Sequence, residues 1–262
     1  MRIPYFQVNA FTSRSFGGNP AGVCPLEDWL PDELLQRIAA ENNLSETAFF
    51  TKAGDRFHLR WFTPALEVDL CGHATLASAY VLFNELGYRE HTVRFDTRSG
   101  LLAAKRGKDS IEMDFPSRPP AKCSAPDNLV RGLGRKPAEV LKSRDYLAVF
   151  ETPAEVASLK PDMDRLRQLD CLGIIVTAPG EKVDFVSRFF APQAGVPEDP
   201  VTGSAHCTLI PYWAERLGKA ELFAEQISRR GGELVCRNAG ERVAIGGRAV
   251  VYCRGELEIA GA

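Results

Sequence analysis

Short apolar runs along the chain predict many β-strands and few helices. Ten runs of four to six residues are rich in β-branched and aromatic residues and are bounded by glycine, proline and polar residues, a pattern typical of strands. These runs cover 5–8, 48–51, 57–62, 92–95, 110–115, 146–150, 173–177, 185–190, 233–237 and 248–253. An amphipathic helix is expected over 32–41. Since helices do not alternate regularly with the strands, the pattern favours an α+β fold.

Two further helices are predicted to be buried on all sides. Residues 74–84 contain no charged side chain, and their apolar residues cover nearly every direction around a helix, so this helix must be enclosed. Residues 205–214 have the same character, although Pro211 lacks a backbone donor and is expected to kink the helix. We therefore expect curved, barrel-like sheets, each wrapped around one central helix.

An internal repeat relates these two helices. Residues 59–64 match 187–192 in their Arg, Phe and Pro positions at an offset of 128. After three inserted residues, 72–76 aligns with 203–207 at an offset of 131, and a Leu-Gly pair follows each helix at the same distance. This shared spacing favours a duplicated unit over two unrelated strand-loop-helix units.

The proline cluster at 116–120 is the natural place to divide the two copies. We place the first half at 1–118 and the second at 119–262, with the alternative that the C-terminal strands cross back to the first half. At 262 residues the chain is long enough for two compact cores.

Charge and composition exclude several partner classes. The net charge of −2 arises from 32 basic and 34 acidic residues that are well mixed, so no basic stripe is available for nucleic acid. No apolar run approaches the ~18 residues of a membrane span, and the N-terminal residues lack the apolar stretch of a signal peptide. Seven cysteines without paired spacing indicate reduced thiols. We expect a cytoplasmic protein.

The glycines that open the two buried helices are candidate anion sites. The first backbone N–H groups of a helix lack partners within the helix, and the helix dipole is positive there. The amides of Gly72 and His73, and those of Gly203 and Ser204, could therefore bind a carboxylate. If the halves face each other, both helix starts converge on one cleft. The alternative is two ordinary helix starts on tight turns.

Two acidic residues lie near these elements. Asp199 directly precedes the second buried helix, where it could act catalytically or simply cap the helix. Glu46 follows the predicted outer helix and begins an apolar strand. Taken alone, a glutamate beside a turn is usually a solvated surface acid. By position, Asp199 is the better candidate of the two.

Metal and nucleotide cofactors are not expected. Cys71 and His73 in one half, with His206 and Cys207 in the other, contain the right donor types for a metal. However, consecutive helical residues point about 100° apart, so His206 and Cys207 are poorly placed to share one ion. The turn at 17–20 lacks the spacing of a Rossmann or P-loop motif. No lysine stands out as a Schiff-base former.

Several motifs in series resemble the PhzF family. They are Phe11-Thr12 to Phe16-Gly17-Gly18-Asn19-Pro20-Ala21, Leu44-Ser45-Glu46-Thr47-Ala48-Phe49, Cys71-Gly72-His73-Ala74-Thr75, Glu198-Asp199-Pro200-Val201-Thr202-Gly203-Ser204-Ala205 and Arg254-Gly255-Glu256-Leu257. The resemblance covers essentially the whole chain. It implies the diaminopimelate epimerase-like fold, with two pseudosymmetric halves around central helices, and a homodimer.

The resemblance also implies roles for individual residues. In the phenazine-pathway member, a glutamate at the position of Glu46 is the general acid/base that isomerises a dihydro-hydroxyanthranilate, and the positions of His73, Asp199 and Ser204 line the site. The related epimerases use one thiol at each central helix. Here Cys71 matches the first thiol, but the second helix has none.

The leading expectation is therefore a cofactor-independent isomerase that acts on a small carboxylate-bearing metabolite in the cleft between the halves. Two alternatives stay open. One is an amino-acid epimerase that uses Cys71 with Glu46 or Asp199, and the other is a noncatalytic binding protein with the same fold.

Overall fold

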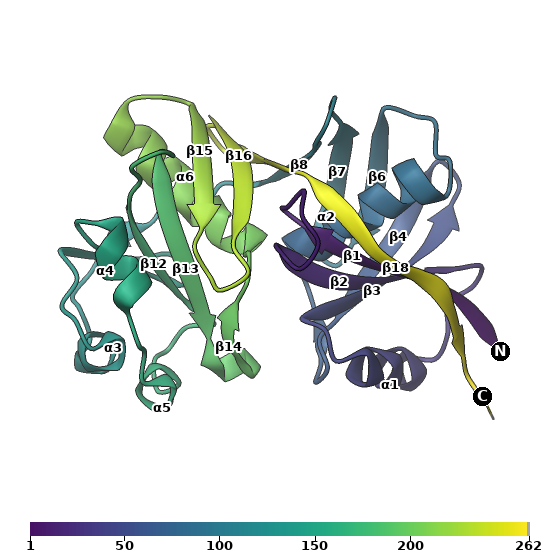
Figure 1. Cartoon of the computed structure of the whole chain (residues 1–262), viewed down its shortest axis with the longest axis horizontal. Helices are drawn as coiled ribbons and strands as arrows, with labels where there is room; N and C mark the ends of the chain where they lie inside the picture. The colour runs from purple at the N-terminus through teal and green to yellow at the C-terminus, as the bar shows by residue number, and fades with distance from the viewer. Residues whose placement is uncertain (261–262) are drawn as a thin grey trace. The chain divides into compact units, whose positions relative to one another are not determined.

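The computed structural model describes residues 1–260, which form two compact units (Figure 1). Unit 1 contains residues 1–114 together with the C-terminal segment from Gly246 onward, and unit 2 contains Phe115–Ile245. The chain thus leaves unit 1 shortly before the proline cluster and returns to it near residue 246. Residues 246–260, which the division at 118 assigns to the second half, lie in unit 1.

The return of the C-terminal strand has a clear physical basis. Strand β18 (Ala249–Glu258) pairs with β1 (Arg2–Ala10) along its whole length, interrupted by one β-bulge. The amino group of Met1 donates a hydrogen bond of 2.7 Å to the carbonyl of Ile259. Strand β18 and the residue that follows it are thereby held beside the N-terminus in unit 1 (Figure 1).

Unit 1 is built on one twisted sheet with the strand order β18-β1-β2-β3-β4-β6-β7-β8. Its further strands are β2 (Asn19–Leu26), β3 (Glu46–Ala53), β4 (Arg56–Phe62), β5 (Glu67–Val68), β6 (Thr92–Thr97), β7 (Gly100–Arg106) and β8 (Ile111–Pro116). The pairs β2–β3 and β4–β6 are parallel, and the short β5 lies beside β4. Most neighbouring strands are otherwise antiparallel.

Helix α2 (Gly72–Tyr80) lies against the inner face of this sheet, and Gly72–Ala79 are all buried. It continues as a π-helical turn over Val81–Glu85, so the predicted buried helix exists but changes its winding near its end. Helix α1 (Asp32–Asn42) covers the outer face, where Leu35, Ile38 and Ala39 pack on Phe49 and Phe62. The apolar character of residues 74–84 is therefore explained by enclosure.

Unit 2 repeats the same order of pairings. Its strands are β9 (Ala121–Lys122), β10 (Glu139–Lys142), β11 (Tyr146–Val149), β12 (Ile174–Pro179), β13 (Phe185–Ala191), β14 (Val196–Asp199), β15 (Glu221–Gln226), β16 (Gly232–Ala239) and β17 (Arg242–Gly247), which ends at the return to unit 1. From β10 to β16 the pairings run antiparallel, parallel, antiparallel, parallel, antiparallel. Strands β1 to β7 show this succession in unit 1. The predicted duplication is thus visible in the strand ladders.

Helix α6 (Gly203–Leu217) lies against the sheet of unit 2 and runs unbroken through Pro211. Proline cannot donate to the carbonyl four residues earlier, which is that of Cys207. The backbone N–H of Arg118 supplies this hydrogen bond instead, at 2.9 Å. A donor from a neighbouring segment therefore satisfies the carbonyl that Pro211 leaves open.

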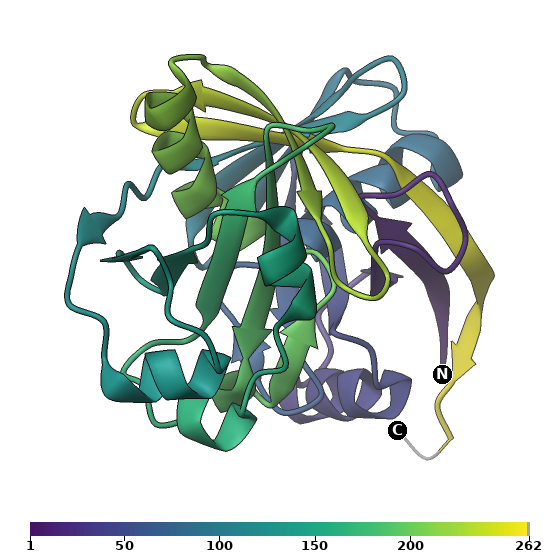
Figure 2. The ribbon, with the colours of Figure 1, turned by 60° about the vertical axis from the view of Figure 1, so that its left-hand side comes forward.

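Three short helices cover the other face of the unit 2 sheet (Figure 2). They are α3 (Asp127–Leu133), α4 (Pro153–Ser158) and α5 (Met163–Leu166). A 3-10 turn at Pro192–Ala194, which follows β13, contacts α5. Because helices cover both faces, the first five residues of β12 are all buried. The sequence did not predict these helices, which are each only one to two turns long.

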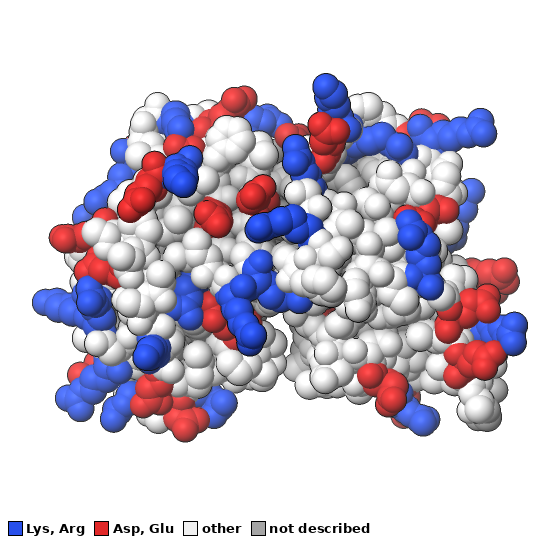
Figure 3. All heavy atoms as spheres, viewed as in Figure 1, with Lys and Arg blue, Asp and Glu red and all other residues white. Residues whose placement is uncertain are grey.

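All ten predicted strands coincide with strands of the structure. None of the helices among residues 1–260 is long and apolar enough to cross a membrane. On the face shown in Figure 3, basic and acidic side chains are interspersed, as the mixed charge of the sequence indicates.

Candidate functional site

Glu46 is the first residue of β3 and lies at the end of a sharp change in chain direction. Asn43 caps the C-terminal end of helix α1 in a left-handed conformation with φ 47°. Three residues later the chain enters β3, where Glu46 pairs with Ala21 of the parallel strand β2. The side chain of Glu46 is only 17% exposed, so it is not the solvated surface acid that its local sequence suggests.

His73 lies between Glu46 and two other polar side chains of unit 1. Its Nε2 is 3.0 Å from Oε2 of Glu46. Its Nδ1 is 3.1 Å from Nδ2 of Asn19 and 3.5 Å from Sγ of Cys71. The imidazole, the amide and the thiol are all buried. The structure thus brings together three residues singled out from the sequence and adds Asn19.

Asn19 belongs to one of the PhzF-like motifs, but we did not expect it at the site from the sequence. The sequence Gly17-Gly18-Asn19-Pro20 was interpreted as a turn, whereas Asn19 opens β2 and is fully buried. A buried asparagine needs a polar partner, but nothing in the linear sequence connects Asn19 with a histidine 54 residues away.

The charges of this group influence one another strongly. Burial raises the pKa of the Cys71 thiol to about 11, Glu46 adds to this rise, and His73 opposes it. Burial alone would lower the pKa of His73, but negative charge on Cys71 and Glu46 outweighs burial and raises it well above 6.5. Near neutral pH the thiol of Cys71 is therefore protonated and uncharged, so the part of the rise in the His73 pKa that a Cys71 thiolate would cause is absent, and burial is opposed by the contact with Glu46.

Glu46, Cys71 and His73 also form a possible set of metal ligands, with donor atoms within 4.8 Å of one another. A metal ion binds a histidine through one ring nitrogen. Here the thiol lies at Nδ1, whereas the carboxylate lies at Nε2. One ion could not reach both partners through the same nitrogen without a rearrangement. The arrangement fits a chain of polar contacts through the imidazole better than a shared metal.

In unit 2, Asp199 is the last residue of β14 and is anchored by its neighbours. The hydroxyl of Thr202 donates to Oδ2 of Asp199 at 2.5 Å. The fully buried Gln226 donates to the carbonyl of Asp199 at 2.8 Å and to Thr202 Oγ1 at 3.1 Å. Its Oε1 accepts from the backbone N–H of Thr202. Thr202 and Gln226 were not expected from the sequence, and they hold the segment that carries Asp199.

The two predicted anion sites begin helices in the same manner. Gly72 opens α2 and Gly203 opens α6. The preceding residues, Cys71 and Thr202, have extended backbones and make no side-chain capping hydrogen bond. At the N-terminus of each helix, the first backbone N–H groups therefore receive no hydrogen bond from the side chain of the N-cap residue. That both starts share one cleft stays a prediction.

A second buried histidine, His206, lies in the first turn of α6. Its Nδ1 is 2.8 Å from the carbonyl oxygen of Thr202, and its ring lies beside Phe185. Nε2 is buried without a hydrogen-bond partner. Burial lowers the pKa of His206 to about 4, so the side chain is neutral. Its packing is that of a core residue.

A bidentate arginine–glutamate pair, here called an arginine fork, links the two strands that precede each central helix. In unit 1, Arg60 Nε and Nη2 lie 2.8 and 2.9 Å from the two carboxylate oxygens of Glu67. In unit 2, Arg188 makes the same bidentate pair with Glu198, at 2.7 and 3.0 Å. Arg60 also binds Asp32 of α1, and Arg188 also donates to carbonyls at the end of α4. Each fork therefore ties the strand pair before the central helix to an outer helix.

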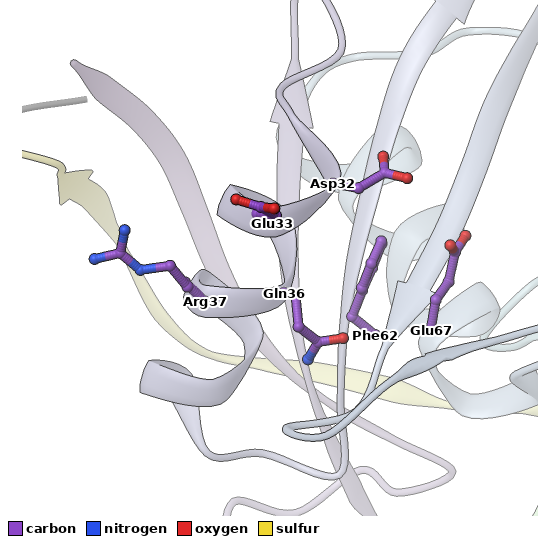
Figure 4. A pocket seen from close by; sticks show the side chains of 6 residues that line it. All are labelled: Asp32, Glu33, Gln36, Arg37, Phe62 and Glu67. Carbon is purple, nitrogen blue, oxygen red and sulfur yellow. The ribbon is translucent and has the colours of Figure 1, made fainter.

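A separate pocket of about 560 Å³ opens beside α1 (Figure 4). Its lining includes Asp32 and Glu67, whose carboxylates lie against Arg60. The acidic groups of this pocket are thus part of the supporting fork. We assign no chemistry to the pocket.

Comparison with known proteins identifies relatives over nearly the whole chain. The family model of phenazine biosynthesis-like proteins, PhzC-PhzF, matches residues 8–255. A protein of Pseudomonas aeruginosa named as an uncharacterized isomerase is 54% identical and covers 99% of this chain and 100% of its own. A PhzF-family crystal structure from Enterococcus faecalis superimposes with a TM-score of 0.96 at 47% identity, covering 99% of this chain and 100% of that one.

A more distant structure supports the fold alone. A probable proline racemase of Agrobacterium radiobacter aligns with a TM-score of 0.65 at 12% identity, over 99% of this chain and 93% of its own. The predicted diaminopimelate epimerase-like architecture with two pseudosymmetric halves is confirmed.

Proposed function

Because the chain belongs to the PhzC-PhzF family of phenazine biosynthesis-like proteins, we propose that it is an isomerase that moves a proton within a small carboxylate-bearing molecule. In this proposal Glu46 is the general acid/base, and neither a metal nor an organic cofactor takes part. The observation that carries the proposal is the contact of 3.0 Å between Glu46 and the buried His73 beside the start of α2.

The geometry suits a carboxylate that takes a proton and returns it. Oε2 of Glu46 is buried against His73. The Oε2 side of the carboxylate therefore lies against His73, and the 17% of the Glu46 side chain that is exposed does not include Oε2. We assign proton transfer to Oε1, whose position is fixed by the contact at Oε2. A positioned acid/base group of this kind typically contributes ~10² to 10⁴ in rate.

The start of α2 supplies the complementary binding group. The amides of Gly72 and His73 can accept a substrate carboxylate, because helix N-termini carry unpaired donors and a positive dipole. The same argument applies to Gly203 and Ser204 in unit 2, where the anchored Asp199 is the second proposed catalytic residue. A homodimer, which the sequence resemblance implies, stays a prediction.

Substitution of Glu46 by Gln tests the proposal. Glutamine keeps the shape of the side chain but cannot accept a proton, so the rate should fall by ~10² to 10⁴ while the fold is retained. The measurement is deuterium incorporation from heavy water, followed by mass spectrometry. A dihydro-hydroxyanthranilate is the first compound, followed by a panel of unsaturated acids and amino acids. Glu41→Gln, an exposed glutamate of α1, is the matched control.

The same assay separates the isomerase from the epimerase alternative. An epimerase that uses Cys71 would lose exchange in Cys71→Ala and retain it in Glu46→Gln. We expect the reverse, since the Cys71 thiol is protonated near neutral pH. Wild-type exchange rates in Glu46→Gln on a confirmed substrate would refute the role of Glu46.

A further inference from the structure

The two ring nitrogens of His73 face chemically different partners. Nδ1 faces Nδ2 of Asn19 at 3.1 Å and the thiol of Cys71 at 3.5 Å. Nε2 faces the carboxylate of Glu46 at 3.0 Å. His73 is 3% exposed and Asn19 is fully buried, so these partners are fixed by the surrounding core.

From this geometry we propose that Asn19 is a positioning residue, which fixes the hydrogen of His73 on Nε2 so that it faces Glu46. The side-chain nitrogen of asparagine can only donate, so the nitrogen that it faces must offer a lone pair. A neutral imidazole that accepts at Nδ1 carries its hydrogen on Nε2. The orienting partner of one ring nitrogen commonly sets the role of the other.

Cys71 contributes less to this choice than Asn19. Its sulfur is farther from Nδ1 and, near neutral pH, the protonated thiol can also donate. Negative charge on Glu46 favours a second proton on the ring. Such a proton on Nδ1 would point at the amide hydrogens of Asn19, placing two donors face to face. Asn19 therefore opposes the second proton as well as the wrong tautomer.

The inference rests on the proposed function, because its consequence is the orientation of Glu46. A hydrogen on Nε2 faces Oε2 across the 3.0 Å contact, and its attraction for the carboxylate favours an orientation in which Oε1 is the atom that exchanges protons. With the hydrogen on Nδ1, the lone pair of Nε2 would face the carboxylate oxygen and repel it. Asn19 thus acts on Glu46 through His73, without touching the substrate.

Nitrogen NMR of the histidine rings tests the proposal without any substrate. In uniformly ¹⁵N-labelled protein at pH 8, two-bond ¹⁵N–¹H correlations distinguish a protonated from an unprotonated ring nitrogen. The chain has four histidines, so the His73 signals are assigned by their loss in His73→Gln. We expect Nδ1 unprotonated and Nε2 protonated. A hydrogen on Nδ1 in the wild-type protein would overturn the proposal, whatever the variants do.

Asn19→Asp replaces the hydrogen-bond donor that faces Nδ1 by an acceptor and keeps nearly the same side-chain shape. An aspartate oxygen accepts, so the hydrogen should move to Nδ1 or the ring should become doubly protonated. Asn128→Asp is the matched control, because Asn128 also donates to another side chain, Gln168, but lies exposed in unit 2. The control should leave the His73 signals unchanged. An Asn19→Asp protein that keeps the wild-type tautomer would contradict the proposal.

Cys71→Ala separates the two partners of Nδ1. We expect the wild-type tautomer to persist, since the amide of Asn19 remains. A shift of the hydrogen to Nδ1 in Cys71→Ala would assign the role to the thiol and refute the proposal for Asn19. The NMR result does not depend on turnover, so failure of the Glu46 exchange experiment and failure of this inference are distinguishable.

Discussion

Helices α2 and α6 begin alike but carry different chemistry. Each starts with a buried glycine after an extended residue, and each has a buried histidine in its first turn. In α2, Nε2 of His73 lies 3.0 Å from the carboxylate of Glu46. In α6, burial lowers the pKa of His206 to about 4, and its Nδ1 contacts a backbone carbonyl rather than a carboxylate. The same backbone therefore supports a polar cluster in one unit and a core residue in the other.

The strand ladders show why only unit 1 has a carboxylate in the position of Glu46. Thr47 lies opposite Phe62, and Ile174 lies opposite Phe190, which is the repeat counterpart of Phe62. The residue before Thr47 is Glu46, whereas the residue before Ile174 is Gly173. A Cβ at Gly173 would lie 2.1 Å from the ring of Phe189. The duplication thus preserved the scaffold twice, while the carboxylate site exists in one copy only.

The steric difference can be tested at Gly173. In Gly173→Ala the new methyl group collides with three atoms of the Phe189 ring, which is 5% exposed and cannot move freely. We expect a loss of about 3 kcal/mol in the free energy of unfolding, at the upper end for overpacking. Urea denaturation measures it. Gly255→Ala, with no atom within 4 Å of the added Cβ, should change stability little. Equal stability of both variants would contradict the steric argument.

The contrast between the histidines predicts a pH effect on stability. His206 has a pKa of about 4 in the folded protein and 6.5 in the unfolded chain. As the pH falls below 6.5, His206 becomes protonated in the unfolded chain but stays neutral in the folded protein. The free energy of unfolding therefore decreases progressively until the pH reaches about 4. Between pH 8 and pH 5 this amounts to about 2 kcal/mol. The measurement compares urea denaturation of the wild type and His206→Gln at both pH values. The glutamine variant should lose less stability on acidification, and identical losses would refute the assignment.

The two arginine forks should contribute similar amounts to the free energy of unfolding. Arg60→Lys and Arg188→Lys each replace a bidentate pair by a point charge, which should cost about 1 kcal/mol of stability. Because the forks have nearly the same geometry, the two losses should agree within about 0.5 kcal/mol. Arg98→Lys is the control, since Arg98, whose side chain is 57% exposed, contacts Glu67 through a single ion pair rather than a bidentate one. Urea midpoints provide the comparison. A large loss in only one unit would show that the forks are not equivalent.

The sequence determined the elements whose signal is local. Apolar runs predicted ten of the strands, and the uncharged stretches identified α2 and α6 as central helices. The repeated Arg, Phe and Pro positions indicated the duplication. Strand β2 was missed because Asn19-Pro20-Ala21-Gly22 has the composition of a turn. Its paired neighbours β1 and β3 supply the stabilisation that local propensity does not.

Only the tertiary structure decided which polar residues meet. Taken alone, Glu46 is indistinguishable from a surface acid, and Asn19 from a turn residue. The parallel pairing of β2 with β3, and the packing of α2 on both strands, bring them to His73. The pKa shifts follow from this burial and proximity. Contacts between residues far apart in the chain depend on strand register and helix packing, which no local pattern of hydrophobic and polar residues specifies.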